Sequence, residues 1–584
     1  MIKILKNLNK KDIQLILIST LLIIFQVFLD LKLPDYMSSI TALVQTEGSK
    51  MGDILINGGK MLLCALVSLI SAICVGYLIS FMSSNFSRNL RNKLFKKVEL
   101  FGMEEIKKFS TSSLITRTTN DITNIEMFLS MGLQTLIKAP ITAVWAVLKI
   151  LNKNIVWSII TGIAVVVLLL VIFILLIIVF PKFKMVQKLI DNINSLTREH
   201  LSGIRVIRAF NAESFQEEKF DNANKTLTKT QIFNQKTMSI LSPTMYLVMN
   251  MLTLSIYFVG SYLINNSLMA NKITMFSDMV VFSSYAMQVI MSFLMLAMMF
   301  IMYPRASVSA DRVTEVLNTE EKIKDGNFSG NTKEKGVVEF KNVSFKYPDG
   351  EEYLLKDISF KVKSGETIAF IGSTGSGKST LINLVPRFYD VTEGSILIDG
   401  INVKDYKLET LNNKIGYIPQ KAIMFNGSVK YNVTYGSENK INNDKLKEAV
   451  KVAQGEDFVL KMVKQYDANI SQGGTNISGG QKQRLNIARA IYKNPEIYIF
   501  DDSFSALDYK TDYKLRNELK KYTKDATIMI VASRVGTILD ADKIVVLDKG
   551  KCVGIGTHKE LMKKCKVYKE IAYSQLSKEE LNNA

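Results

Sequence analysis

The sequence predicts two domains of different class: an all-α domain with six transmembrane helices, followed by an α/β domain of the P-loop type. Three observations lead to this prediction. The chain has 584 residues, and single hydrophobic cores stop growing at about 250 to 300 residues, so more than one domain is expected. Long uncharged segments occur only before about residue 305, and short β-like segments separated by turns follow. A glycine-rich loop, GSTGSGKS, lies among those later segments.

Six apolar segments are candidates to cross a membrane. A bilayer core needs roughly 20 apolar residues per helix, and unbroken apolar segments of this length have no use in a soluble protein. Two of the six are weaker: the first ends in a polar stretch with Asp30 and Lys32, and the third is interrupted by Lys138. We predict a transmembrane domain over residues 1–310, with spans at about 13–34, 61–87, 127–152, 155–180, 238–264 and 279–304.

Basic side chains indicate which side of the membrane each loop occupies. The net charge of +19 could suggest a nucleic-acid partner, but the lysines and arginines concentrate after the second and fourth spans. By the positive-inside rule these two segments and both termini are cytoplasmic, in a multi-pass protein of the plasma membrane.

The first span has no small-residue cleavage site and is expected to stay uncleaved. The four cysteines support neither a zinc site nor a disulfide framework, and abundant Lys, Asn and Ile are typical of an AT-rich bacterial genome.

The two cytoplasmic excursions are expected to be helices that leave the membrane, turn and return. In the first, the turn is predicted at the Ser/Thr-rich segment Ser110–Asp121. Counting 1.5 Å per residue from there places Lys138 on the order of 28 Å along the returning helix, near the inner membrane surface, where it can snorkel. The alternative is a substrate-binding charge inside the bilayer. Within the second excursion, the segment Gly203–Phe220 has the mixed charged and apolar pattern of a surface that docks on a partner domain.

The strongest motif is GSTGSGKS, which fits G-x-x-x-x-G-K-[ST] between an apolar strand and a helical segment. In such a loop, backbone N–H groups surround the phosphates, and the helix N-terminus adds positive potential. Lys378 is expected to reach the β and γ phosphates, while the Ser379 hydroxyl and Asp501, at the end of the apolar strand Ile497–Phe500, hold Mg²⁺. The predicted phosphate-binding residues are Gly372, Ser373, Thr374, Gly375, Ser376, Gly377, Lys378, Ser379 and Thr380.

With the segment NISGGQKQR, Asn476–Arg484, the chain resembles the ATP-binding cassette (ABC) transporters over nearly its whole length. ISGGQ is similar to their signature LSGGQ, and the layout is that of an exporter half, with a linker at 311–335, a cassette at 336–575 and a polar tail at 576–584. The resemblance implies that Tyr347 stacks on adenine, that Gln420 contacts Mg²⁺ and that Ser505–Asp508 form the D-loop. It also implies that the signature contacts the γ-phosphate of ATP held by a partner cassette, through Ser478, Gly479, Gly480 and Gln481.

Two positions depart from the family pattern. Asp502 stands where the family has the glutamate that activates water, and Ser533 stands where it has the switch histidine. Aspartate is one CH₂ shorter, and a misplacement of about 1 Å can cost on the order of 100-fold in rate. Serine reaches less far than imidazole and cannot carry a positive charge. The resemblance therefore implies the degenerate half of a heterodimeric ATPase, which binds Mg-ATP but hydrolyses it weakly. The alternative is a homodimer in which both substitutions are harmless.

The sixth span is rich in methionine, at Met287, Met291, Met295, Met298, Met299 and Met302. Flexible thioethers suit loose binding of varied apolar molecules, and they also serve ordinary helix packing. Together with the resemblance, this predicts export of amphipathic drugs or lipid-like compounds. A lipid flippase and a regulatory or channel-like protein of the same architecture remain open.

Overall fold

The computed structural model describes residues 1–584 except 47, 152–154, 268, 438–440 and 577–584. It divides into two compact units, which we describe separately. The N-terminal unit comprises Met1–Glu99 and Ser112–Thr319, and the C-terminal unit comprises Leu100–Thr111 and Glu320–Ala584. The predicted polar tail at 576–584 lies outside the described residues from 577 onward, as does residue 152 of the third predicted span.

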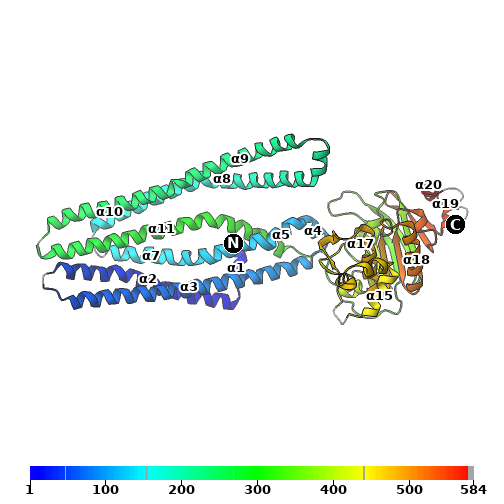
Figure 1. Cartoon of the computed structure of the whole chain (residues 1–584), viewed down its shortest axis with the longest axis horizontal. Helices are drawn as coiled ribbons and strands as arrows, with labels where there is room; N and C mark the ends of the chain where they lie inside the picture. Colours follow the sequence, from blue (N-terminus) through cyan, green and yellow to red (C-terminus); the bar gives the residue numbers. More distant parts are fainter. Residues whose placement is uncertain (47, 152–154, 268, 438–440, 577–584) are drawn as a thin grey trace. The chain divides into compact units, whose positions relative to one another are not determined.

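The N-terminal unit consists of long helices that run side by side (Figure 1). Within the described residues, six helical segments are long and apolar enough to cross a membrane, so the predicted six-helix class is confirmed. Apolar side chains such as Ile163, Phe173 and Phe258 lie exposed on their surfaces, as lipid-facing side chains do. The helices are α1 (Ile2–Leu5), α2 (Lys10–Gln45), α3 (Met51–Glu99), α5 (Thr111–Thr116), α6 (Ile122–Met127), α7 (Leu133–Leu151), α8 (Ile155–Ala209), α9 (Glu213–Ser239), α10 (Leu241–Asn265) and α11 (Met269–Asn318).

The first cytoplasmic excursion does not turn where the sequence predicted. The segment Ser110–Asp121 is helical from Thr111 onward, with π-helical turns at Arg117–Asp121 and Phe128–Gly132 that join α5, α6 and α7. Its threonines remain compatible with a helix because their hydroxyls donate to carbonyls four residues earlier, as Thr118 does to Leu114 at 2.8 Å. The chain reverses instead around α4 (Met103–Phe109).

Moving this turn changes the expected position of Lys138. Counted from Thr111, Lys138 lies about 40 Å along the returning helix at 1.5 Å per residue, well beyond the predicted 28 Å. Its ammonium pairs with Asp30 of α2 at 3.2 Å. The interpretation of Lys138 as a lysine that snorkels to the inner surface is therefore wrong, because its partner lies near the far end of the first span.

The C-terminal unit is an α/β domain, as predicted, and its described residues form three sheets. A six-stranded sheet has the order β12-β11-β3-β10-β9-β6, an antiparallel sheet has the order β2-β1-β4-β5, and β7 pairs with β8. The strands are β1 (Val338–Phe345), β2 (Leu355–Val362), β3 (Thr367–Gly372), β4 (Glu393–Ile398), β5 (Ile401–Asn402), β6 (Ile415–Ile418), β7 (Gly427–Ser428), β8 (Asn469–Ile470), β9 (Ile497–Asp501), β10 (Thr527–Val531), β11 (Lys543–Asp548) and β12 (Lys551–Gly556).

Helices cover the six-stranded sheet and complete the unit. They are α12 (Lys378–Asn383), α13 (Leu408–Lys414), α14 (Val429–Val433), α15 (Asn443–Val452), α16 (Glu456–Lys461), α17 (Gly479–Lys493), α18 (Tyr509–Tyr522), α19 (His558–Lys564) and α20 (Lys566–Gln575). Because α11 continues to Asn318, residues 311–318 are helical and do not belong to the linker in which the sequence analysis placed them.

Strand β9 shows why the central strands are apolar on both faces. Ile497 and Ile499 pack into the core shared with the antiparallel sheet, whereas Tyr498 and Phe500 pack into the core formed with α15, α17 and α18. A parallel strand covered on both sides is expected to be a near-continuous apolar segment. This rigid strand holds Asp501 buried at its carboxyl end.

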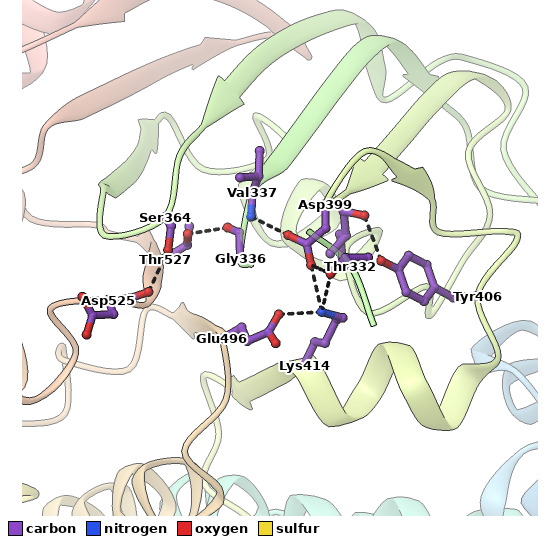
Figure 2. A network of polar contacts seen from close by, with 11 residues as sticks. Thr332, Gly336, Val337, Ser364, Asp399, Tyr406, Lys414, Glu496, Asp525 and Thr527 are labelled. Carbon is purple, nitrogen blue, oxygen red and sulfur yellow. Dashed lines mark hydrogen bonds and ion pairs between the residues drawn. The ribbon is translucent and has the colours of Figure 1, made fainter. Parts of the chain in front are cut away.

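A polar network attaches the segment before β1 to the sheets (Figure 2). The ammonium of Lys414 donates to Asp399 at 2.8 Å and to Glu496 at 2.6 Å, while Asp399 also accepts from the N–H of Val337 at 2.8 Å and the hydroxyl of Thr332 at 3.0 Å. Burial alone would lower the pKa of Lys414, but the two carboxylates outweigh it and raise the pKa above its ordinary value. Lys414 therefore stays charged in a largely buried position.

Candidate functional site

The loop between β3 and α12 has the backbone of a phosphate-binding loop. Gly375 and Gly377 have φ angles of +83° and +97°, a region that glycine adopts without strain. A Cβ at Gly377 would lie 2.6 Å from Cδ2 of Leu355, and one at Gly372 would lie 2.1 Å from the carbonyl oxygen of Leu547. Gly375 is therefore favoured by its backbone conformation, Gly372 by the lack of space for a side chain, and Gly377 by both.

The polar groups of this loop fit a bound triphosphate. The ammonium of Lys378 donates to the carbonyls of Gly372 and Ser373, each at 2.8 Å, so it lies folded over the loop. Burial lowers the pKa of Lys378, and the nearby Asp502 and Asp501 oppose this shift. The hydroxyl of Ser376 is buried next to Gly372, so it supports the loop from inside. The ammonium of Lys378 is the group that can turn from the loop carbonyls to a phosphate oxygen.

Ser379 and Asp501 lie together as a magnesium site requires. The hydroxyl of Ser379 donates to Oδ1 of Asp501 at 2.7 Å. Burial raises the pKa of Asp501; the hydrogen bond from Ser379 lowers it, and the neighbouring charge of Asp502 raises it again, with a net increase. Hydroxyl and carboxylate oxygens are ligands that Mg²⁺ prefers, so these residues fit the ion. Ser379 and Asp501 would hold Mg²⁺, which would supply positive charge beside the phosphates.

The two residues that depart from the family pattern contact each other. The hydroxyl of Ser533 donates to Oδ1 of Asp502 at 2.9 Å, and the Ser533 N–H approaches the same oxygen at 3.3 Å. The side-chain amide of Gln420, which follows β6, donates to Oδ2 of Asp502 at 3.4 Å. Asp502 has a φ of +46°, which turns the chain directly after β9. Three donors of the protein therefore engage this one carboxylate.

The segment around Ser533 is held from behind by the last helix, α20. The side-chain amide of Gln575 donates to the carbonyl of Ser533 at 3.0 Å and accepts from the N–H of Val535 at 2.8 Å. The sequence analysis did not identify Gln575, because a single glutamine at the end of a helix matches no motif. It acts on the site only through the backbone of Ser533.

Tyr347 lies beside the start of α12. Its hydroxyl is 3.0 Å from that of Thr380 in α12, and its ring packs edge-on against Tyr389. The ammonium of Lys107, from α4, lies 4.7 Å from the centroid of the Tyr347 ring. Hydrogen bonding to Tyr389 raises the pKa of Lys107 against the effect of its partial burial, so the lysine is charged. Lys107 was also missed by sequence analysis, since no motif links residues so far apart in the chain.

The signature residues form a separate structure at the start of α17. Ser478 caps this helix: its hydroxyl accepts from the N–H of Gln481 at 3.3 Å, and its own N–H donates to the Gln481 side chain at 2.9 Å. No atom lies within 4 Å of a Cβ built on Gly479, so this helix start is open. In the described part of the chain, the hydrogen bonds of Ser478 and Gln481 do not reach the Walker residues. Hydrogen bonds thus connect the predicted nucleotide-site residues in one region, whereas the bonds of the signature stay within its own helix start. The residues of that region are Tyr347, Lys378, Ser379, Gln420, Asp501, Asp502 and Ser533.

Comparisons with known proteins match both units. The family model for the ABC transporter transmembrane region matches residues 16–322, and that for the ABC transporter matches residues 355–505. An uncharacterized ABC transporter ATP-binding protein of Mycobacterium tuberculosis is 36% identical over 550 residues, covering 92% of this chain and 93% of the relative. An ATP-dependent lipid A-core flippase of Haemophilus influenzae is 30% identical over 534 residues, covering 89% and 87%.

One solved structure extends this likeness to the whole fold. An ATP-bound bacterial Atm1-family ABC exporter superposes with a TM-score of 0.83 at 23% identity, covering 97% of this chain and 99% of that one. Among the described residues, six helices that are long and apolar enough to cross a membrane precede an α/β domain in the same chain. The chain therefore belongs to the ABC transporters and is one half of an ATP-driven exporter, with one transmembrane region and one ATP-binding domain.

Proposed function

We propose that this chain is the ATP-holding half of a heterodimeric exporter of amphipathic drugs or lipid-like compounds. Its own Walker site binds Mg-ATP, through Lys378, Ser379, Gln420 and Asp501, and hydrolyses it weakly. Its signature motif completes a competent site whose Walker residues belong to a different half-transporter. The ATP-binding domain and both termini are cytoplasmic, and the membrane is a bacterial plasma membrane.

The observation that supports this proposal is the bonding of Asp502. A general base needs an oxygen within about 2.6 to 3.2 Å of the water that it activates. Asp502 is shorter than glutamate, and its oxygens already accept from Ser533 and Gln420 at 2.9 to 3.4 Å. The same serine replaces the histidine that would contact the γ-phosphate. Both substitutions therefore act on one carboxylate, and they weaken hydrolysis without removing any group that holds the nucleotide.

The signature supports the division of work between two chains. Ser478 and Gln481 form an ordered helix cap at an open helix start, so this chain keeps the part that a partner's ATP needs. A homodimer would contain two weakened sites and no competent one.

At the second excursion, Phe210 and Phe215 are exposed at the turn between α8 and α9, a surface suited to docking on another domain.

The methionines of α11 support an amphipathic substrate. Met291, Met295 and Met298 are exposed and follow one another at intervals of four and three residues, which places them on one face of the helix. A flexible, polarisable stripe of this kind accommodates apolar groups of varied shape.

A lipid flippase is the second candidate function. The relative from Haemophilus influenzae is an ATP-dependent lipid A-core flippase that matches 89% of this chain. Reconstitution with a labelled lipid and, separately, with a labelled drug distinguishes the two functions. A regulatory or channel-like protein would instead show substrate movement down a gradient without sustained hydrolysis.

ATP turnover with and without the partner tests the heterodimer. The candidate partner is a half-transporter with Glu and His at the positions of Asp502 and Ser533, sought first in an adjacent reading frame. We expect the chain alone to turn over ATP about tenfold more slowly than the pair, or slower still, because its own site is misaligned. Comparable turnover per chain without the partner would contradict the proposal.

A further inference from the structure

Two ion pairs connect α2 and α7 inside the N-terminal unit. The ammonium of Lys138 lies 3.2 Å from Asp30, and that of Lys149 lies 2.8 Å from Asp35. Asp30 lies about 30 Å along α2 from its start at Lys10, at 1.5 Å per residue, which is close to the full thickness of a bilayer core and places both pairs toward its outer edge. Paired charges on facing membrane helices are candidate contacts for a charged ligand.

Both aspartates have a second hydrogen-bond donor. The hydroxyl of Ser68, from α3, donates to Asp30 at 2.5 Å, and the hydroxyl of Tyr285, from α11, donates to Asp35 at 2.5 Å. The four charged side chains remain between 24% and 34% exposed. Either lysine can therefore turn toward an incoming anion, because its aspartate keeps a donor from a third helix.

An apolar groove lies along α7 between the two lysines. It has a volume of about 420 Å³ and is lined by Pro140, Ile141, Val144, Trp145 and Leu148. Lys138, Ile141, Trp145 and Lys149 follow one another at intervals of three, four and four residues, so they share one face of the helix. The groove is therefore apolar along its length, with a cationic side chain at each end.

The charge balance around the groove favours an anion. Beyond the first turn of α2, the charged residues of α2 and α7 are the lysines Lys32, Lys138 and Lys149 and the aspartates Asp30 and Asp35. Lys32 lies 5.7 Å from the centroid of the Phe28 ring, and that ring contacts Trp145 in the groove at a centroid distance of 5.7 Å. On these two helices the three cations outnumber the two anions by one, which favours an anionic partner.

We propose that this groove binds a lipid-like amphiphile with an anionic head group, and that such molecules are the substrate class of the exporter. The acyl part lies along Ile141, Val144 and Trp145, and the head group pairs with Lys138 or Lys149 at one end. This inference rests on the proposed export of amphipathic compounds and narrows their chemistry. Its test below requires neither ATP turnover nor a partner chain, so its failure is distinguishable from failure of the heterodimer proposal.

Fluorescence of Trp145 measures binding directly. The chain has two tryptophans, and Trp157 is only 1% exposed, so Trp157→Phe leaves Trp145 as the single reporter. The full-length variant is reconstituted in phosphatidylcholine nanodiscs that contain a rising fraction of lipid brominated on its acyl chains. Brominated phosphatidylglycerol carries an anionic head, and brominated phosphatidylcholine is the matched zwitterionic probe. We expect brominated phosphatidylglycerol to quench Trp145 at a lower mole fraction than brominated phosphatidylcholine does. The difference should be about fivefold for each lysine that the head group engages.

Paired neutral substitutions separate charge recognition from folding. Lys138→Gln with Asp30→Asn, and Lys149→Gln with Asp35→Asn, remove each ion pair without leaving a lone charge in the membrane. One or both should shift the phosphatidylglycerol curve toward that of phosphatidylcholine, whereas Lys60→Gln, an exposed lysine of α3, should not. Equal quenching by both lipids would overturn the proposal, because it indicates ordinary surrounding lipid. Quenching by neither would also overturn it, because another protein surface then covers the groove.

Discussion

Asp502 is the residue on which the proposed division of work depends. Its carboxylate follows a rigid buried strand, and it accepts from Ser533 and Gln420, which reach it from two other loops. A carboxylate that is satisfied by protein donors and set back by one CH₂ is poorly placed to orient an attacking water. The main nucleotide-holding groups, Lys378 and Ser379, bond to other partners, and only Gln420 is shared with Asp502. Binding and hydrolysis can therefore be lost independently at this site.

Substitution of Tyr347 tests whether this site binds ATP in the proposed way. Tyr347→Ala should weaken ATP binding by the chain about 5- to 150-fold, because stacking of a base on an aromatic ring contributes roughly 1–3 kcal/mol. Tyr347→Phe keeps the ring and loses only the contact with the Thr380 hydroxyl, so its effect should stay below about tenfold. Equilibrium binding of a fluorescent ATP analogue measures both. Equal losses in the two variants would show that the ring does not stack on the base.

At the scale of elements, helix α20 positions the switch segment from outside the nucleotide site. Gln575 spans the turn by bonding the carbonyl of Ser533 and the N–H of Val535. These two bonds fix the backbone from which the Ser533 hydroxyl reaches Asp502. A movement of α20 is thus expected to shift the backbone of Ser533 through Gln575.

Gln575→Leu should loosen the switch segment at a cost of about 1–3 kcal/mol, since both backbone groups lose their partner. Gln575→Glu keeps the acceptor for the Val535 N–H and should have a smaller effect. Hydrogen exchange of the amides around Ser533 reports the loosening in both variants. Unchanged exchange in Gln575→Leu would show that α20 does not hold this segment.

The Lys414 network is a second connection between elements. It joins the segment before β1 to the sheets of the C-terminal unit (Figure 2). Lys414→Met should destabilise this unit by about 3–5 kcal/mol, because it leaves Asp399, whose side chain is 0% exposed, as a buried charge without a counterion. Adding Asp399→Asn should recover part of the loss. Thermal unfolding of the full chain at a fixed scan rate compares the variants; equal destabilisation of the single and double variants would contradict this account.

The pH dependence of this network follows from the raised pKa of Lys414. A lysine whose folded-state pKa exceeds its unfolded value of about 10.4 contributes stability that is fully present below that value and is lost as the pH rises through the folded-state pKa. The difference in unfolding temperature between wild type and Lys414→Met should therefore be constant from about pH 6 to 9. A difference that shrinks within this range would indicate that another group titrates in the network.

For the whole molecule, the fold class and the motifs could be predicted from the sequence, because both depend on local patterns. Apolar length identified the six spans, and the strand-loop-helix context identified the loop that contains Lys378. The turn predicted near Ser110 failed because threonine hydroxyls bond back to their own helix, which composition does not reveal. The contacts of Asp502 with Ser533, Lys107 with Tyr347 and Lys138 with Asp30 join distant parts of the chain. A single sequence contains no local signal for such pairs.

The whole exporter is proposed to work with one ATP held at the Asp502 site while the partner's site turns over. In that arrangement this chain contributes its signature to catalysis and its membrane helices to the transport path. Restoring the family residues at both departing positions should convert the holding site into a second hydrolytic one.

The most direct test uses the heterodimer in which the catalytic glutamate of the partner's site has been replaced, so that only the Asp502 site can hydrolyse ATP. Asp502→Glu with Ser533→His in this chain should raise the remaining ATPase rate about 10- to 100-fold over the unsubstituted chain, because both groups are returned to catalytic reach. ATP binding at the site should change little. A substantial rate at the unsubstituted site that the double substitution does not raise would contradict the claim that this chain is the ATP-holding half.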